Sequence, residues 1–166
     1  MRQLAIIIRT SVMALSAVLV FGSLTAPLRS LDSFLPFVVP PAARLGGAVL
    51  LGAGALLLFS CFVLFAAGGA LSAGPTFPDP PVFISRGPYR LVRNPMAKGL
   101  FTVLTGWGLY LRSPAFLLFT GCLAVAMHLL VVLVEEPKLR RRFGASYDSY
   151  CARVGRWLPR WRASPL

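Results

Sequence analysis

The chain has 166 residues, of which 57% are hydrophobic and only 13% are charged, and its mean hydropathy is +0.74. Soluble domains carry about 25% charged residues, so this composition excludes an ordinary soluble domain and indicates a membrane protein. The net charge of +12 alone would suit a nucleic-acid binder, but the apolar content excludes that class. The three cysteines have neither a disulfide framework nor the spacing of metal ligands.

Two apolar segments open the chain, and each is long enough to span a membrane, which takes about 20 residues. The first runs over about 4–28. We expect it to be retained, although Arg2 before an apolar run also suits a cleaved signal peptide. The second runs over about 45–71, and its many Gly and Ala residues favour close contact with another helix. The proline-rich stretch 29–44 between them is a predicted loop.

Two further apolar segments, about 99–111 and 114–134, are separated only by LRSP at 111–114. This spacing predicts a helical hairpin, and the short first segment implies that its helix begins before Gly99. Segment 72–98 precedes the hairpin, and its six prolines exclude a continuous helix. The strongly basic tail, 135–166, follows it. We therefore predict an all-α integral membrane protein with about four spans, in one membrane domain over 1–166.

The basic residues are distributed unevenly between the two sides that four spans would create. With both termini, segment 72–98 and the tail on one side, that side holds fourteen of the 17 Lys and Arg residues. The other side keeps Arg29, Arg44 and Arg112. The positive-inside rule makes the richer side cytoplasmic, so we predict a bacterial cytoplasmic membrane protein with cytoplasmic termini.

Two polar segments should meet at this cytoplasmic side. One is RGPYRLVRNPMAKG, residues 86–99, and the other starts at Glu135 and Glu136, where the fourth helix leaves the membrane. An antiparallel hairpin brings the stretch 94–98 close to both glutamates. A carboxylate at a helix C-terminus is unfavourable, so two interpretations stay open. The glutamates form an ion pair with Arg140 or Arg93, or they bind a ligand.

His128 is the only histidine, and it lies seven residues before Glu135, on the same face of a regular helix. An ionisable group at membrane depth is a functional candidate. The simpler interpretation is a neutral histidine hydrogen-bonded to a neighbouring helix.

Both polar segments resemble the signatures of one enzyme family. GPYRLVRNPMAKG resembles the pattern GPYxxxRHPxYxG of the isoprenylcysteine carboxyl methyltransferases, and EEPKLRRRFGASYDSYCARVGRWLP resembles their second pattern, EExxLxxxFGxxYxxYxxxVxRWxP. Phospholipid N-methyltransferases are looser relatives. The resemblance implies that residues 72–166 form the methyltransferase region, with 1–71 supplying two preceding spans.

The resemblance also implies S-adenosylmethionine as the methyl donor, in a cytosolic pocket built from the loop before the hairpin and from the tail. It assigns cofactor contacts to the residues at the matching positions: Val82, Phe83, Ile84, Tyr89, Asn94, Pro95, Met96, Ala97, Glu135 and Tyr147. For the acceptor side, Arg93, Arg90 or Arg140 could hold an acidic head group. His128 or Glu136 is the candidate base for an acceptor that needs deprotonation.

The chain departs from the family pattern at three positions. Asn94 replaces the histidine and Ala97 the tyrosine of the first signature, and Val131 stands where the eukaryotic enzymes carry an arginine. The amide of Asn94 can still donate to the cofactor's carboxylate, so the first departure is compatible with cofactor binding. The missing arginine at Val131 concerns the prenylcysteine carboxylate of the acceptor more than the cofactor. We expect a methyltransferase that acts on a lipid-like or prenylated acceptor, at a carboxylate. The alternatives are a phospholipid amine N-methyltransferase, a non-catalytic four-helix scaffold, and a membrane reductase, for which the chain lacks a GxGxxG motif.

Overall fold

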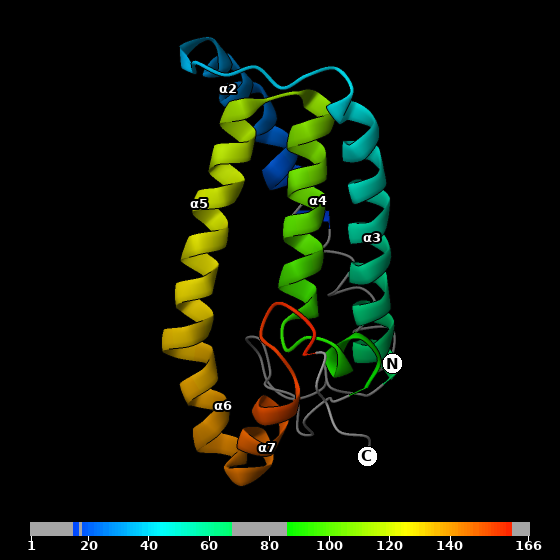
Figure 1. The fold of residues 1–166 in the computed structure, drawn as a ribbon, viewed down its shortest axis with the longest axis vertical. Helices are drawn as coiled ribbons and strands as arrows, with labels where there is room; N and C mark the ends of the chain where they lie inside the picture. The colour runs from blue at the N-terminus through cyan, green and yellow to red at the C-terminus, as the bar shows by residue number, and fades with distance from the viewer. Residues whose placement is uncertain (1–14, 17, 68–85, 161–166) are drawn as a thin grey trace.

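The computed structural model describes residues 15, 16, 18–67 and 86–160. Within these ranges every regular element is a helix and no strand forms (Figure 1), which confirms the predicted helical class. The elements, in chain order, are α2 (Thr25–Ser30), η1 (Asp32–Phe34), α3 (Ala43–Ala67), η3 (Gly87–Arg90), α4 (Pro95–Leu111), α5 (Pro114–Leu130), η4 (Val131–Glu135), α6 (Glu136–Phe143) and α7 (Ala145–Arg153).

Two helices of the described residues are long and apolar enough to cross a membrane. They are Ala43–Leu64 within α3, and Pro114–Phe143, in which α5, η4 and α6 form one continuous helix. The expected fourth span at 114–134 therefore continues further than predicted. The apolar helix Val18–Ser30 and the 17-residue α4 are shorter, and residues 1–14 of the expected first span lie outside the described residues. The four-span topology stays a prediction.

The hairpin of α4 and α5 forms where LRSP predicted it, and α4 begins at Pro95, before Gly99. Arg112 ends α4 in the left-handed conformation, with φ of 58°. The side chain of Ser113 then accepts a hydrogen bond from the Phe116 backbone and caps α5. Asp32 accepts hydrogen bonds from the Ser113 hydroxyl and the Ala115 N–H, each at 2.9 Å. A carboxylate at this N-terminus suits the helix dipole, and it ties the first loop to the hairpin.

Glycines let α3 and α4 pack with their backbones almost in contact. A Cβ atom added to Gly47 would lie 2.6 Å from the Tyr110 nitrogen and 2.7 Å from the Gly106 oxygen. A Cβ on Gly54 would lie 2.9 Å from the Gly99 oxygen. Small residues permit such an approach between membrane helices, so the expectation from the Gly- and Ala-rich second segment is confirmed.

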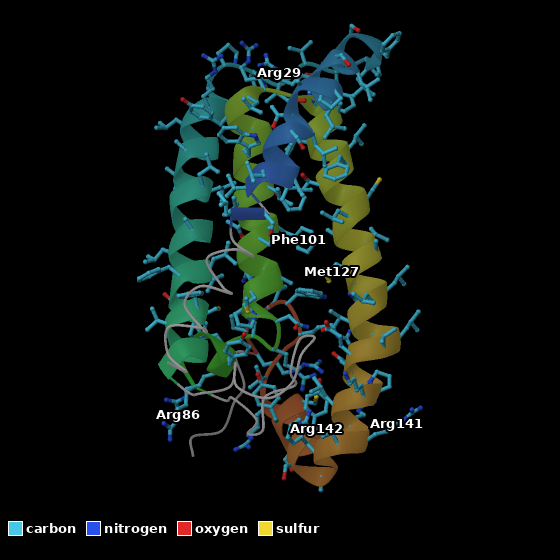
Figure 2. All side chains as sticks on the ribbon, turned by 180° about the vertical axis from the view of Figure 1, so that it is seen from behind. Arg29, Arg86, Phe101, Met127, Arg141 and Arg142 are labelled. Atoms are coloured by element: carbon cyan, nitrogen blue, oxygen red, sulfur yellow. The ribbon has the colours of Figure 1, made fainter. Side chains whose placement is uncertain are left out.

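Helices α3, α4 and α5 run side by side, with α2 at one end and α6 and α7 at the other (Figure 1). In Figure 2, Arg29 lies at the α2 end, whereas Arg86, Arg141 and Arg142 lie at the opposite end. We call this second end, which holds η3, α6 and α7, the basic end. Its basic residues belong to the segments that the charge distribution assigned to one side of the membrane.

Candidate functional site

The two signature segments meet at the basic end. Val92 and Gly155 form an isolated parallel bridge, in which the Arg93 N–H donates to the Gly155 oxygen at 2.8 Å. The hydroxyl of Tyr150 donates to the Tyr89 carbonyl at 2.7 Å. Burial raises the pKa of Tyr150, so this hydroxyl keeps its proton and remains a donor. These contacts join the stretch before α4 to α7 and the residues after it.

Glu136 is the centre of the polar contacts at this end. Its side chain is 7% exposed and faces two guanidinium groups. Arg93 donates from Nη1 to Oε1 at 2.9 Å, and Arg156 donates from Nε to Oε1 at 2.6 Å and from Nη2 to Oε2 at 2.9 Å. The hydrogen bond to Glu136 raises the pKa of Arg156. We call Arg93, Glu136 and Arg156 the Glu136 cluster.

The cluster decides between the two partners that the sequence left open for an ion pair. Glu136 pairs with Arg93, whereas Arg140 pairs with Asp148 at 3.2 Å on an exposed surface. The buried pair links residues 43 positions apart, so it fixes the start of α6 against the stretch before α4.

The π-helix η4 determines which of the two adjacent glutamates faces inward. Its hydrogen bonds span five residues, as in the bond from the Glu136 N–H to the Val131 carbonyl, so it takes up one residue more than a regular turn. Regular spacing predicted Glu135 on the face of His128. In the structure Glu136 is buried there and Glu135 is exposed, and the side chains of both His128 and Glu136 contact the C-terminal segment.

One nitrogen of Arg93 donates to no acceptor in the described part of the chain. Its Nη1 contacts both Glu136 and the sulfur of Cys151, the latter at 3.0 Å, and its side chain is 10% exposed. The Nε atom of Arg93 is buried and has no hydrogen-bond partner among the residues that the structure describes. Buried donors normally have an acceptor, and the Glu136 cluster combines two guanidinium groups with one carboxylate.

His128 accepts a hydrogen bond at Nδ1 from the indole N–H of Trp157, at 3.0 Å. The simpler interpretation of His128 expected a partner on a neighbouring helix, but the structure places that partner in the segment after α7. A neutral imidazole that accepts at Nδ1 carries its proton on Nε2. Its role as a base stays a prediction.

The residues that the resemblance assigned to the cofactor lie in three environments. Val82, Phe83 and Ile84 fall outside the described residues. Tyr89, Asn94 and Ala97 are half-buried and Pro95 is buried, while Met96 and Glu135 are exposed. Tyr147, on α7, is buried beside Cys151 in a small core with Tyr150 and Val154. The structure thus brings Tyr89, the start of α4 and Tyr147 to one end and directs Glu135 outward. Their cofactor roles stay predictions.

Sequence reasoning did not single out Cys151, Arg156 or Trp157. Arg156 and Trp157 were visible as the RW of the second signature, but nothing in a linear pattern says which carboxylate or imidazole such residues contact.

Comparison with known proteins gives one match. The model of the phospholipid methyltransferase family matches residues 42–146, and neither a curated protein nor a solved structure matches the chain. This family shares a membrane methyltransferase superfamily with the isoprenylcysteine carboxyl methyltransferases. The match spans more than half of the 166 residues and includes α3, α4, α5 and α6, so the chain belongs to the phospholipid methyltransferase family.

Proposed function

We propose that this protein transfers a methyl group from S-adenosylmethionine to a lipid-like acceptor at the basic end, and that the methyl group goes to a carboxylate of that acceptor. The observation that carries this proposal is the buried Nε of Arg93, which has no partner within residues 15, 16, 18–67 and 86–160, in a cluster with more cations than anions. The family match supports methyl transfer as the reaction class.

The residues around the start of α4 fit the polar groups of S-adenosylmethionine. Asn94 precedes the helix, and its side chain does not cap it, so the amide is available to a ligand's carboxylate. The first N–H groups of α4 lack helical partners and favour an anion. Tyr89 and Tyr147 supply aromatic faces nearby. When bound, S-adenosylmethionine would supply a methyl group on a sulfonium, whose sulfur would leave as a neutral thioether, so transfer to a carboxylate oxygen would require no proton to be removed.

A carboxylate acceptor also suits this site because Glu136 and His128, the candidate bases, are both engaged in other hydrogen bonds. Glu136 is held by two guanidinium groups, which favour its charged form and make it a weak base. His128 is already engaged with Trp157 through Nδ1. An ionised carboxylate needs neither of them, and Arg93 Nε can donate to it. The lipid part of the acceptor would reach the site from the bilayer along the apolar surfaces of α4 and α5.

The second candidate is N-methylation of a phospholipid amine, which the description of the matched family favours. That reaction requires a base to deprotonate the ammonium group before transfer. In this case Arg93 would hold the phosphate, and His128 would be the base.

Methyl-labelled S-adenosylmethionine separates these functions. We expect the purified protein to bind the cofactor in titration calorimetry, and membranes that contain it to label a lipid fraction. Heating that fraction in alkali should release the label as methanol, because carboxyl methyl esters hydrolyse whereas N-methyl groups do not. Arg93→Met should abolish labelling and Arg90→Met, at an exposed neighbouring position, should not. A label that is stable in alkali would indicate that an amine, and not a carboxylate, receives the methyl group. Absence of cofactor binding would favour the scaffold interpretation.

A further inference from the structure

The segment after α7 lies beyond the family-matched residues 42–146, yet it completes the candidate site. Its described residues are 154–160, and Figure 1 shows them in red below the lower end of α4. Its contacts with the two signature segments include a pairing of Gly155 with Val92, of Arg156 with Glu136, and of Trp157 with His128. These contacts connect the stretch before α4 to the α5–α6 helix, so the segment closes the basic end between them.

Arg156 holds both oxygens of the Glu136 carboxylate. Its Nε donates to Oε1 and its Nη2 donates to Oε2, which is the planar, two-point geometry that only arginine provides. Such a pair fixes the orientation of the carboxylate as well as its position. Because Oε1 also accepts from Nη1 of Arg93, the direction of Glu136 determines how the Arg93 guanidinium is turned.

Trp157 fixes the place from which Arg156 reaches Glu136. Its indole N–H donates to His128 on α5, eight residues before Glu136 along the same continuous helix. Adjacent residues of the segment thus contact the α5–α6 helix at two points. Because the segment is held at both contacts, it cannot rotate about either one alone.

We propose that Arg156 is a positioning residue that acts through Glu136 to orient Arg93 toward the anionic group of the acceptor, and that the Trp157–His128 hydrogen bond holds Arg156 in place. The inference rests on the proposed function only for the identity of that anionic group. It accounts for the Nε of Arg93, which is buried without a hydrogen-bond partner among the described residues: Nη1 is committed to Glu136, and Nε is left to donate to the anionic group of the acceptor.

Packing alone does not account for Arg156. Its side chain is 29% exposed at the edge of the cluster, and Glu136 keeps Arg93 as a partner when Arg156 is absent. Apolar residues of similar volume often replace buried ion pairs without loss of stability. Arg156→Met should therefore fold, and so should Arg156→Lys, which keeps the charge without the two-point geometry.

The kinetic test compares these variants with Arg153→Met, a matched control on α7 whose guanidinium donates to a backbone carbonyl on an exposed surface. Arg156→Met should lower kcat/KM for the acceptor by on the order of 100-fold, because small misplacements have effects of that size. The affinity for S-adenosylmethionine should be unchanged, and Arg156→Lys should recover part of the loss. Wild-type kinetics in Arg156→Met would overturn the inference. An equal loss of affinity for S-adenosylmethionine in Arg156→Met and Arg156→Lys would also overturn it.

A second readout does not depend on catalysis. In protein labelled with ¹⁵N-arginine, the Nε–H signal of Arg93, assigned by its loss in Arg93→Lys, should be sharp in the wild type. It should broaden in Arg156→Met and in Trp157→Phe, sharpen partly in Arg156→Lys, and stay sharp in Arg153→Met. An Arg93 signal insensitive to Arg156 would overturn the inference. If the wild type transfers no methyl group, this signal still decides whether Arg156 orients Arg93, so the two proposals fail separately.

Discussion

Glu135 and Glu136 are neighbours in the sequence but have different environments in the structure. The side chain of Glu136 is 7% exposed between two guanidinium groups, whereas Glu135 lies on the exposed side of the helix. Replacing Glu136 with glutamine removes the negative charge and leaves the two guanidinium groups uncompensated. Removal of one partner from a buried ion pair is strongly destabilising because the remaining charge is buried unpaired.

We expect Glu136→Gln to lower the free energy of unfolding by roughly 3 kcal/mol. Glu135→Gln is the matched control, one residue away with the same chemical change, and it should stay within about 0.5 kcal/mol of the wild type. Thermal unfolding in detergent measures both. Equal shifts in the two variants would mean that Glu136 is not held as the structure places it.

The two glutamates also mark a limit of sequence reasoning. Their closeness to the stretch before α4 was predictable, because an antiparallel hairpin brings the two ends of its helices together. Which glutamate faces inward was not, since it depends on η4, and the apolar run VVLVE has the pattern of an ordinary helix. The pairing of Glu136 with Arg156 depends in turn on the tertiary position of the segment after α7.

Helices α3 and α4 are held together at their glycines, so a single methyl group should separate them. At Gly47 an added Cβ would lie within 3 Å of two backbone atoms of α4, which cannot move independently of the helix. At the adjacent Gly46 an added Cβ would meet nothing within 4 Å. Both positions are helical, so substitution by alanine changes helix propensity equally and only the contact differs.

Gly47→Ala should therefore destabilise the protein by about 1–3 kcal/mol, the usual effect of overpacking. Gly46→Ala should be neutral or stabilising by up to about 1 kcal/mol, because alanine favours the helix. The midpoints of thermal unfolding in one detergent give the comparison. If Gly47→Ala proves as stable as Gly46→Ala, the two helices do not pack through these glycines.

The helix boundaries show which parts of an element are encoded locally. The start of α5 was predictable because Ser113 and Pro114 are a cap and a first-turn residue in adjacent positions. The continuation of α5 through η4 into α6 was not, because Glu135, Glu136 and Pro137 together resemble the end of an apolar helix. The buried ion pairs of Glu136 stabilise this continuation, and they form only in the tertiary structure.

The whole molecule separates its charges by end, and this separation predicts its orientation in the membrane. The α2 end carries Arg29, whereas Arg86, Arg141 and Arg142 lie at the basic end (Figure 2). The positive-inside rule orients such a protein with the basic end in the cytoplasm, the compartment from which a soluble methyl donor would reach the site.

Single cysteines at the two ends test this orientation. In a background in which Cys122 and Cys151 are replaced by alanine, only the fully buried Cys61 remains. A new cysteine at Ser33, exposed in η1, should react in intact cells with a maleimide that does not cross membranes. A cysteine at Ser149, exposed on α7, should react only after the cells are permeabilised. The reverse pattern would place the Glu136 cluster outside the cell, away from any cytosolic methyl donor, and the proposed reaction would not be possible there.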